Sequence, residues 1–152
     1  RDLHEEGDGG WMRGYPEAGE AAPLGEVAVK GQGSELAIVT FGNGVYLSEQ
    51  ARPMIDADLR VIDLRWLAPL AEEALLQAIE GCKRVLIVDE CRRTGGQNEA
   101  LIALLAEKTD IPVARYAADD SFIATGPAYG ATLPSRDGII AAAQTLLARK
   151  AP

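Results

Sequence analysis

The chain has 152 residues, 47 % of them hydrophobic, which suits one domain with a single core. Its formal net charge of -8 at pH 7 disfavours nucleic acid and anionic membrane surfaces as partners, because both attract clustered Lys and Arg. No apolar run approaches the ~20 residues of a membrane span, and the two cysteines have no metal-ligand spacing, so we expect reduced thiols in a cytoplasmic protein.

Residues 1–24 predict a linker, because they are rich in acidic residues and glycine and show no periodicity. Trp11 and Tyr15 either pin this stretch to a neighbouring surface or lie in a poorly ordered terminus, and we favour the second interpretation. The only histidine, His4, also lies here, which nearly excludes a histidine-based triad or zinc site within the chain. Because the chain begins with Arg1, we expect it to be a piece of a longer protein.

The next segment predicts two strands and a helix. Residues 26–30 alternate in polarity, as an edge strand does, and residues 36–41 (LAIVTF) form a near-continuous apolar run typical of a strand buried on both faces. Gly42, Asn43 and Gly44 interrupt this run. The apolar positions that follow fit one face of a helix: Val45, Leu47, Ala51, Met54 and Ile55.

A strand over residues 59–64 (LRVIDL) is followed by a helix over residues 71–79, acidic in its first turn and stopped by Gly81. Residues 85–88 predict a further buried strand that ends in charge at Asp89 and Glu90. A polar turn through Arg92, Arg93, Thr94, Gly95 and Gly96 then leads to a helix with Leu101, Ile102, Leu104 and Leu105 on its apolar face. In open α/β sheets, ligands and partners tend to sit at this carboxyl end of a central strand.

Residues 111–116 predict the last strand, residues 117–135 a long polar connection, and residues 136–149 a helix with Ile139, Ile140, Ala143, Leu146 and Leu147 on one stripe. The five strands alternate with helices throughout the chain. That alternation predicts an α/β fold with a mostly parallel sheet and helices on both faces.

Four groups of residues are candidates for chemistry. Gly42-Asn43-Gly44 precedes a helix that could hold an anion, but the glycine pattern is incomplete and a tight turn is the better interpretation. Asp89, Glu90, Arg92 and Arg93 could act on protons or hold an anion, although without a nucleophile a surface charge network or an interface ranks higher. Cys91 lacks a histidine base for catalysis, and Asp119-Asp120 lacks further oxygen ligands for a metal, so a solvated loop is favoured there.

Three segments, LGEVAVKGQGSELAIVTFGNGV, RVIDLRWLAPL and VLIVDECRRTGGQNEALIALLAE, together resemble the C-terminal domain of transketolase-type, thiamine diphosphate-dependent enzymes. The nearest branch is the beta subunit of the decarboxylating components of 2-oxo acid dehydrogenases. The resemblance makes residues 1–24 the linker from a missing pyrimidine-binding domain and residues 25–152 the transketolase C-terminal-like domain. In the common pattern a histidine precedes the arginine of the turn. Here Cys91 stands before two arginines, which suggests a divergent branch, for example one with fused alpha and beta regions.

The resemblance implies a three-layer α/β/α sandwich around a five-stranded mixed sheet of order 1-3-2-4-5, with strand 1 antiparallel. A local reading of residues 26–41 would instead make a hairpin. Following the resemblance, we expect the first strand to pair with residues 59–64.

The resemblance also implies a function. The chain would be the accessory C-terminal domain of a pyruvate or branched-chain 2-oxo acid dehydrogenase, giving contacts in a homo- or hetero-oligomer and docking the peripheral subunit-binding domain of the dihydrolipoyl acyltransferase. Thiamine diphosphate and magnesium would bind in the preceding domains, leaving no catalytic, cofactor or metal residue in this chain. Two alternatives remain: a transketolase-like or deoxyxylulose phosphate synthase-like enzyme, and a free-standing small-ligand module using residues 42–45 and 92–96.

Three residues are candidates for partner docking: Asp110, Arg92 and Arg93. The resemblance places an acidic residue of the docking region in the segment Asp110-Ile111-Pro112-Val113, and an acidic dock would steer a positively charged partner. Alternatively, Asp110 only caps the turn into the last strand.

Overall fold

The computed structural model describes residues 17–149, so the expectations for His4, Trp11 and Tyr15 lie outside the described residues. Five strands form one sheet: β1 (Ala28–Lys30), β2 (Leu36–Thr40), β3 (Leu59–Asp63), β4 (Val85–Arg92) and β5 (Val113–Ala118). Four α-helices connect or follow them: α1 (Asn43–Ala51), α2 (Glu72–Ala78), α3 (Gln97–Lys108) and α4 (Arg136–Leu147). Two 3₁₀ helices, η1 (Arg52–Met54) and η2 (Gly126–Ala131), complete the chain order.

The sheet has the order β1-β3-β2-β4-β5. β2, β3, β4 and β5 are parallel to their neighbours, whereas β1 pairs antiparallel with β3, with Ala28 opposite Asp63 and Lys30 opposite Val61. The order 1-3-2-4-5 with an antiparallel first strand is therefore confirmed, and the hairpin suggested by local sequence does not form.

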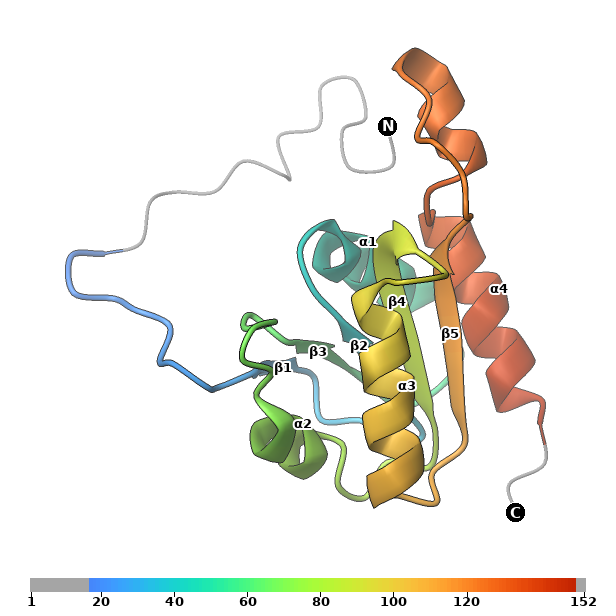
Figure 1. Ribbon diagram of the computed structural model, residues 1–152. Helices are drawn as coiled ribbons and strands as arrows, with labels where there is room; N and C mark the ends of the chain where they lie inside the picture. Colours follow the sequence, from blue (N-terminus) through green and yellow to red (C-terminus); the bar gives the residue numbers. More distant parts are fainter. Residues whose placement is uncertain (1–16, 150–152) are drawn as a thin grey trace.

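Helices cover both faces of the sheet, giving the three layers expected (Figure 1). Side chains of the central strands alternate between two buried clusters because successive residues of a strand point to opposite faces. One cluster lies under α1 and α4 and includes Ile38 and Leu86; the other lies under α2 and α3 and includes Val39 and Ile87. All four of these side chains are fully buried, which explains the unbroken apolar runs of β2 and β4.

Two sequence-based expectations about local structure were wrong. β4 does not end at residue 88 but continues to Arg92, with a register shift against β5 between Asp89 and Arg92. Asp89 is consequently only 1 % exposed, so it does not belong to a surface charge network. Met54 does not share the buried face of α1, because the chain turns into η1 at Arg52 and leaves Met54 55 % exposed.

Two segments reach the carboxyl edge of the parallel strands from opposite ends of the sheet. The chain before β1 arrives there, because Ala28 pairs with the last residue of β3, and the Trp66 indole Nε1 donates a hydrogen bond of 2.9 Å to the Pro23 carbonyl. After β5 the chain makes an excursion over residues 119–132, closed at its base by a 3.0 Å hydrogen bond from Asp119 N to Thr132 O. This excursion contains η2 and extends beyond the layers of the domain (Figure 1).

No helix in the described part of the chain is both long enough and apolar enough to cross a membrane.

Candidate functional site

The candidate site is the junction where β4 turns into α3, and its centre is the buried carboxylate of Asp89. One oxygen, Oδ1, accepts a 2.8 Å hydrogen bond from the backbone N–H of Cys91. The other, Oδ2, accepts two hydrogen bonds from Asn98, 2.9 Å from its backbone N–H and 2.7 Å from its side-chain Nδ2. Buried carboxylates are tolerated when such donors replace water. These hydrogen bonds hold the end of β4 against the start of α3.

Asn98 is fully buried and extends the network to the edge strand β5. Its Nδ2 also donates to the Arg92 carbonyl at 3.1 Å, and its Oδ1 accepts a 2.5 Å hydrogen bond from Nη1 of Arg115. The same Arg115 nitrogen donates to the Arg93 carbonyl at 3.0 Å. The amide therefore connects β4, the turn, α3 and β5.

Gly96 is required by close packing within this network. A Cβ at this position would lie 2.5 Å from both the Arg92 carbonyl oxygen and Nδ2 of Asn98, distances that real Cβ atoms do not show. Gly95, by contrast, adopts a φ of 74° in open space, so its role is conformational. The turn thus requires glycine at these two positions for different physical reasons, close packing at Gly96 and a positive φ at Gly95.

Carboxylates of the chain itself occupy further N–H groups of the turn. Asp120 accepts from the Thr94 N–H at 2.8 Å and from the Thr94 hydroxyl at 2.6 Å, and Glu99 accepts from the Gly95 N–H at 3.0 Å. The hydrogen bonds from Thr94 hold the pKa of the Asp120 carboxyl below its ordinary value, with a smaller contribution from the nearby arginines. A free anion arriving at this turn would find these donors engaged.

The two thiols are both unlike reactive cysteines. Cys82 is buried and Cys91 is exposed at the end of β4. Desolvation, followed by the Asp89 carboxylate, raises the pKa of the Cys91 thiol, and burial raises the pKa of Cys82. A lowered pKa favours thiolate reactivity, and neither thiol has one.

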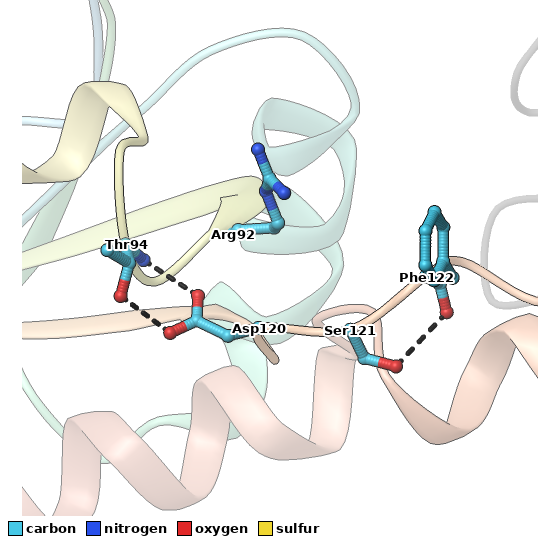
Figure 2. A pocket seen from close by; sticks show the side chains of 5 residues that line it. All are labelled: Arg92, Thr94, Asp120, Ser121 and Phe122. Carbon is cyan, nitrogen blue, oxygen red and sulfur yellow. Dashed lines mark hydrogen bonds between the residues drawn. The ribbon is translucent and has the colours of Figure 1, made fainter.

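An open pocket lies beside the turn and is lined by Arg92, Thr94, Asp120, Ser121 and Phe122. Figure 2 shows the two Thr94–Asp120 hydrogen bonds at one end of the pocket and Phe122 at the other. The Phe122 side chain is 97 % exposed and the next residue, Ile123, is 57 % exposed. The pocket therefore has hydrogen-bonded polar groups at one end and an exposed aromatic ring at the other.

The turn from β2 to α1 is tight and tied to β4. Gly42 has a φ of 56°, and a Cβ on the buried Gly44 would lie 2.1 Å from the Thr40 hydroxyl, so packing alone accounts for this glycine. The Asn43 side chain donates a 3.0 Å hydrogen bond to Glu90. The small residues of this turn serve close packing, as the tight-turn interpretation requires.

The three docking candidates do not lie together. Arg92 and Arg93 are exposed at the carboxyl edge of the sheet, whereas Asp110 is exposed before β5 at the amino edge. β5 has six residues and separates them by about 20 Å. Thr109 makes the capping interactions at this turn: its hydroxyl donates to the Leu105 carbonyl at 2.8 Å and accepts from the Ile111 N–H at 3.4 Å. Within the described residues the Asp110 carboxylate has no hydrogen bond or ion pair.

Sequence reasoning did not single out Asn98, Arg115 or Phe122. No periodicity distinguishes a buried amide or a satisfied arginine from an exposed one. Phe122 did leave a trace, because it is one of two phenylalanines and lies in a stretch, residues 121–135, without a charged residue. Among the described residues no group of three or more His, Cys, Asp or Glu could hold a metal ion.

The topology and the layers define a three-layer α/β/α module around a mixed five-stranded sheet. The chain belongs to the transketolase C-terminal domain family, whose model ("Transketolase, C-terminal domain") matches residues 25–139. It is 30 % identical over 139 residues to the pyruvate dehydrogenase E1 component subunit beta of Staphylococcus aureus, and equally identical over the same length to that of Staphylococcus epidermidis.

These matches cover 87 % of this chain but only 43 % of the relatives, so the chain spans less than half of their length. Among solved structures, a split-gene transketolase in an inactive beta4 tetramer has a TM-score of 0.75 at 25 % identity, covering 88 % of this chain and 47 % of that one. A 2-oxoglutarate:ferredoxin oxidoreductase from Magnetococcus marinus has a TM-score of 0.59 at 15 % identity, covering 80 % of this chain and 20 % of that one, a likeness of fold alone.

Proposed function

We propose that this chain is the accessory C-terminal domain of a thiamine diphosphate-dependent 2-oxo acid dehydrogenase of the pyruvate or branched-chain type, working in the cytoplasm. The observation that carries the proposal is the 30 % identity to pyruvate dehydrogenase E1 beta subunits over 87 % of the chain. The engaged donors of the β4–α3 turn agree with a structural rather than a ligand-binding turn. Residues 1–24 are, in this proposal, the linker from an upstream pyrimidine-binding domain.

Thiamine diphosphate and magnesium belong, in this proposal, to the preceding domains of the full-length enzyme. Titration calorimetry tests that assignment. The chain alone, mixed with thiamine diphosphate and magnesium, is expected to give no stoichiometric heat, and a micromolar, one-to-one signal would contradict it.

The proposed dock for the dihydrolipoyl acyltransferase is the amino edge around Asp110. Its support is the exposed carboxylate, left free because Thr109 caps the turn, in a chain of net charge -8. A positively charged subunit-binding domain would be steered to such a surface. Arg92 and Arg93, at the other edge, belong to a separate contact.

Asp110→Asn in the full-length, oligomeric enzyme is the test of this dock. The variant should bind the acyltransferase subunit-binding domain more weakly at low salt, with the difference shrinking as salt screens the charge. Asp56→Asn is the matched control, because Asp56 is also exposed and lies before β3, three strands from β5. Equal affinities of the two variants, or a lower melting temperature of Asp110→Asn with intact affinity, would refute the dock and support a capping role.

A second candidate is a transketolase-like enzyme, favoured by the likeness to the split-gene transketolase. Assays of the full-length protein separate the two candidates. Reduction of an artificial electron acceptor with a 2-oxo acid supports the dehydrogenase, whereas ketol transfer between sugar phosphates supports the transketolase-like enzyme.

A further inference from the structure

The turn between β2 and α1 contains a pair of residues that can react with each other. An asparagine followed by glycine is prone to spontaneous deamidation, because glycine has no Cβ to keep its backbone nitrogen away from the side-chain amide. The chain has two asparagines, Asn43 before Gly44 and Asn98 before Glu99. Asn43 is exposed, whereas Asn98 is fully buried. Only Asn43 therefore combines exposure with a following glycine.

Packing fixes the glycine of this pair. Gly44 is buried in the first turn of α1, and a Cβ at this position would collide with the side chain of Thr40. Thr40 is itself fully buried, and it is held in β2 opposite Asp63 of β3. An alanine at position 44 would slow the reaction by shielding its own nitrogen, but the core leaves no room for it. The fold thus retains the susceptible pair.

Two hydrogen bonds keep the reacting atoms apart in the folded chain. Deamidation requires the backbone nitrogen of Gly44 to attack Cγ of Asn43. Instead, the Gly44 N–H donates to the Phe41 carbonyl at 3.1 Å, and Nδ2 of Asn43 donates to Glu90 at 3.0 Å. The first bond engages the attacking nitrogen, and the second holds the amide against β4. Both must break before the attack, and the end of a helix opens at a lower free energy than the core.

We propose that Asn43 is a site of non-enzymatic deamidation whose rate is set by the opening of the β2–α1 turn. In the opened turn, the Gly44 nitrogen forms a bond to Cγ of Asn43 and the bond from Cγ to Nδ2 breaks. Nδ2 leaves as ammonia, taking the proton of the Gly44 N–H. Water then opens the cyclic imide at either of its carbonyls and leaves aspartate or isoaspartate at position 43.

The modification changes a contact between neighbouring strands. The hydrogen bond from Asn43 to Glu90 joins the turn after β2 to the end of β4, and these two strands pair in parallel. β2 leads through α1 to β3 on one side, whereas β4 lies on its other side, so the direction of the sheet reverses between β2 and β4. A carboxylate at position 43 replaces this hydrogen bond with repulsion from Glu90. Deamidation therefore separates the two segments at the reversal point.

Peptide mapping by mass spectrometry, on the chain incubated at neutral pH, measures the reaction. Asn98 is the internal control, because it is read in the same digest and is followed by glutamate. In urea, Asn43 should deamidate much faster than Asn98. In the folded chain, the rate at Asn43 should fall by about tenfold or more, since only the opened fraction reacts. A rate at Asn43 in urea no higher than that at Asn98, or equal rates at Asn43 in the folded and unfolded chain, would overturn the proposal.

Variants of Glu90 test the bond that holds the amide. Glu90→Ala frees Nδ2 of Asn43 and should raise the rate in the folded chain about three- to tenfold, the worth of one hydrogen bond. Glu90→Gln keeps an acceptor and is the matched control, so its rate should stay near that of the unaltered chain. In urea all three chains should react alike. If Glu90→Ala reacts no faster than Glu90→Gln, the bond to Glu90 does not restrain Asn43 and this part of the proposal is wrong.

A charge pair tests the consequence of the modification. Asn43→Asp reproduces one product and should lower the melting temperature by about 2–4 °C. Combining Asn43→Asp with Glu90→Gln removes the repulsion and should restore the melting temperature. An unchanged melting temperature of Asn43→Asp, or no recovery in the double variant, would show that the modification does not act through Glu90.

Discussion

The buried amide of Asn98 offers the sharpest test of how the β4–α3 junction is built. Asn98→Ala removes two hydrogen bonds donated by Nδ2, to the Asp89 carboxylate and the Arg92 carbonyl, and one accepted by Oδ1 from Arg115. The backbone N–H at position 98 still reaches Asp89, and Arg115 keeps the Arg93 carbonyl. The substitution therefore removes three hydrogen bonds of the network and leaves the charges of Asp89 and Arg115 in place.

The magnitude follows from what remains buried. A neutral hydrogen bond contributes about 1 kcal/mol and one to a charged group about 1.5–3 kcal/mol. Because the two charged partners keep some donors and acceptors, we expect a loss of about 3 kcal/mol rather than the full sum. For a chain of this length that corresponds to a fall in melting temperature of about 6–12 °C.

Thermal and urea unfolding followed by circular dichroism measure this loss. Gln97→Ala is the matched control, because Gln97 is the preceding residue of α3 and has no hydrogen bond from its side chain within the described residues. It should cost less than about 0.5 kcal/mol, as substitutions away from such networks do. If Asn98→Ala falls in the same range as Gln97→Ala, the network does not stabilise the junction and the reasoning is wrong.

Three further predictions concern the core, the thiol and the loop. Leu104→Ala should lower the free energy of unfolding by about 2–5 kcal/mol, because Leu104 is 8 % exposed in the cluster under α2 and α3. Glu107→Ala, on the exposed side of α3, should lower it far less in the same thermal melts. Cys91 should react with iodoacetamide more slowly at neutral pH than a cysteine in an unfolded peptide, since its raised pKa leaves less thiolate, and a faster reaction would contradict that pKa. The pKa of Asp120 is lowered in the folded chain, so its hydrogen bonds from Thr94 are complete at neutral pH and are lost as the pH falls through that pKa. Asp120→Asn should speed hydrogen exchange of the Thr94 amide at neutral pH. An unchanged exchange rate would show that Asp120 does not hold this amide.

The sequence predicted the elements well because burial leaves a clear pattern in this fold. The apolar runs coincide with β2, whose five residues are all buried, and with the buried first part of β4. Val85, Ile87 and Leu104 lie in the core as expected. The pairing of β1 was not available from local pattern, since a glycine-containing turn before β2 favours a hairpin. Only the family resemblance gave that pairing correctly.

The failures have a common physical origin in tertiary contacts. The charge of Asp89 suggests the end of a strand, but hydrogen bonds from Cys91 and Asn98 make its burial possible. Hydrophobic periodicity reveals neither donor. The spacing of Met54 fits a helix face, yet the change to η1 at Arg52 leaves its side chain on the surface. Site residues were predicted least well because they depend on partners distant in sequence.

The attachment of β1 has a mechanical consequence. β1 is joined to the sheet through three residue pairs with β3, while the four parallel strands keep all of their pairings to one another without it. The segment up to Lys30 can thus open at a lower free energy than any central strand. Tension along the chain ahead of β1 would separate those three β1–β3 pairs first. The parallel strands would then keep their pairing when the segment ahead of β1 moves.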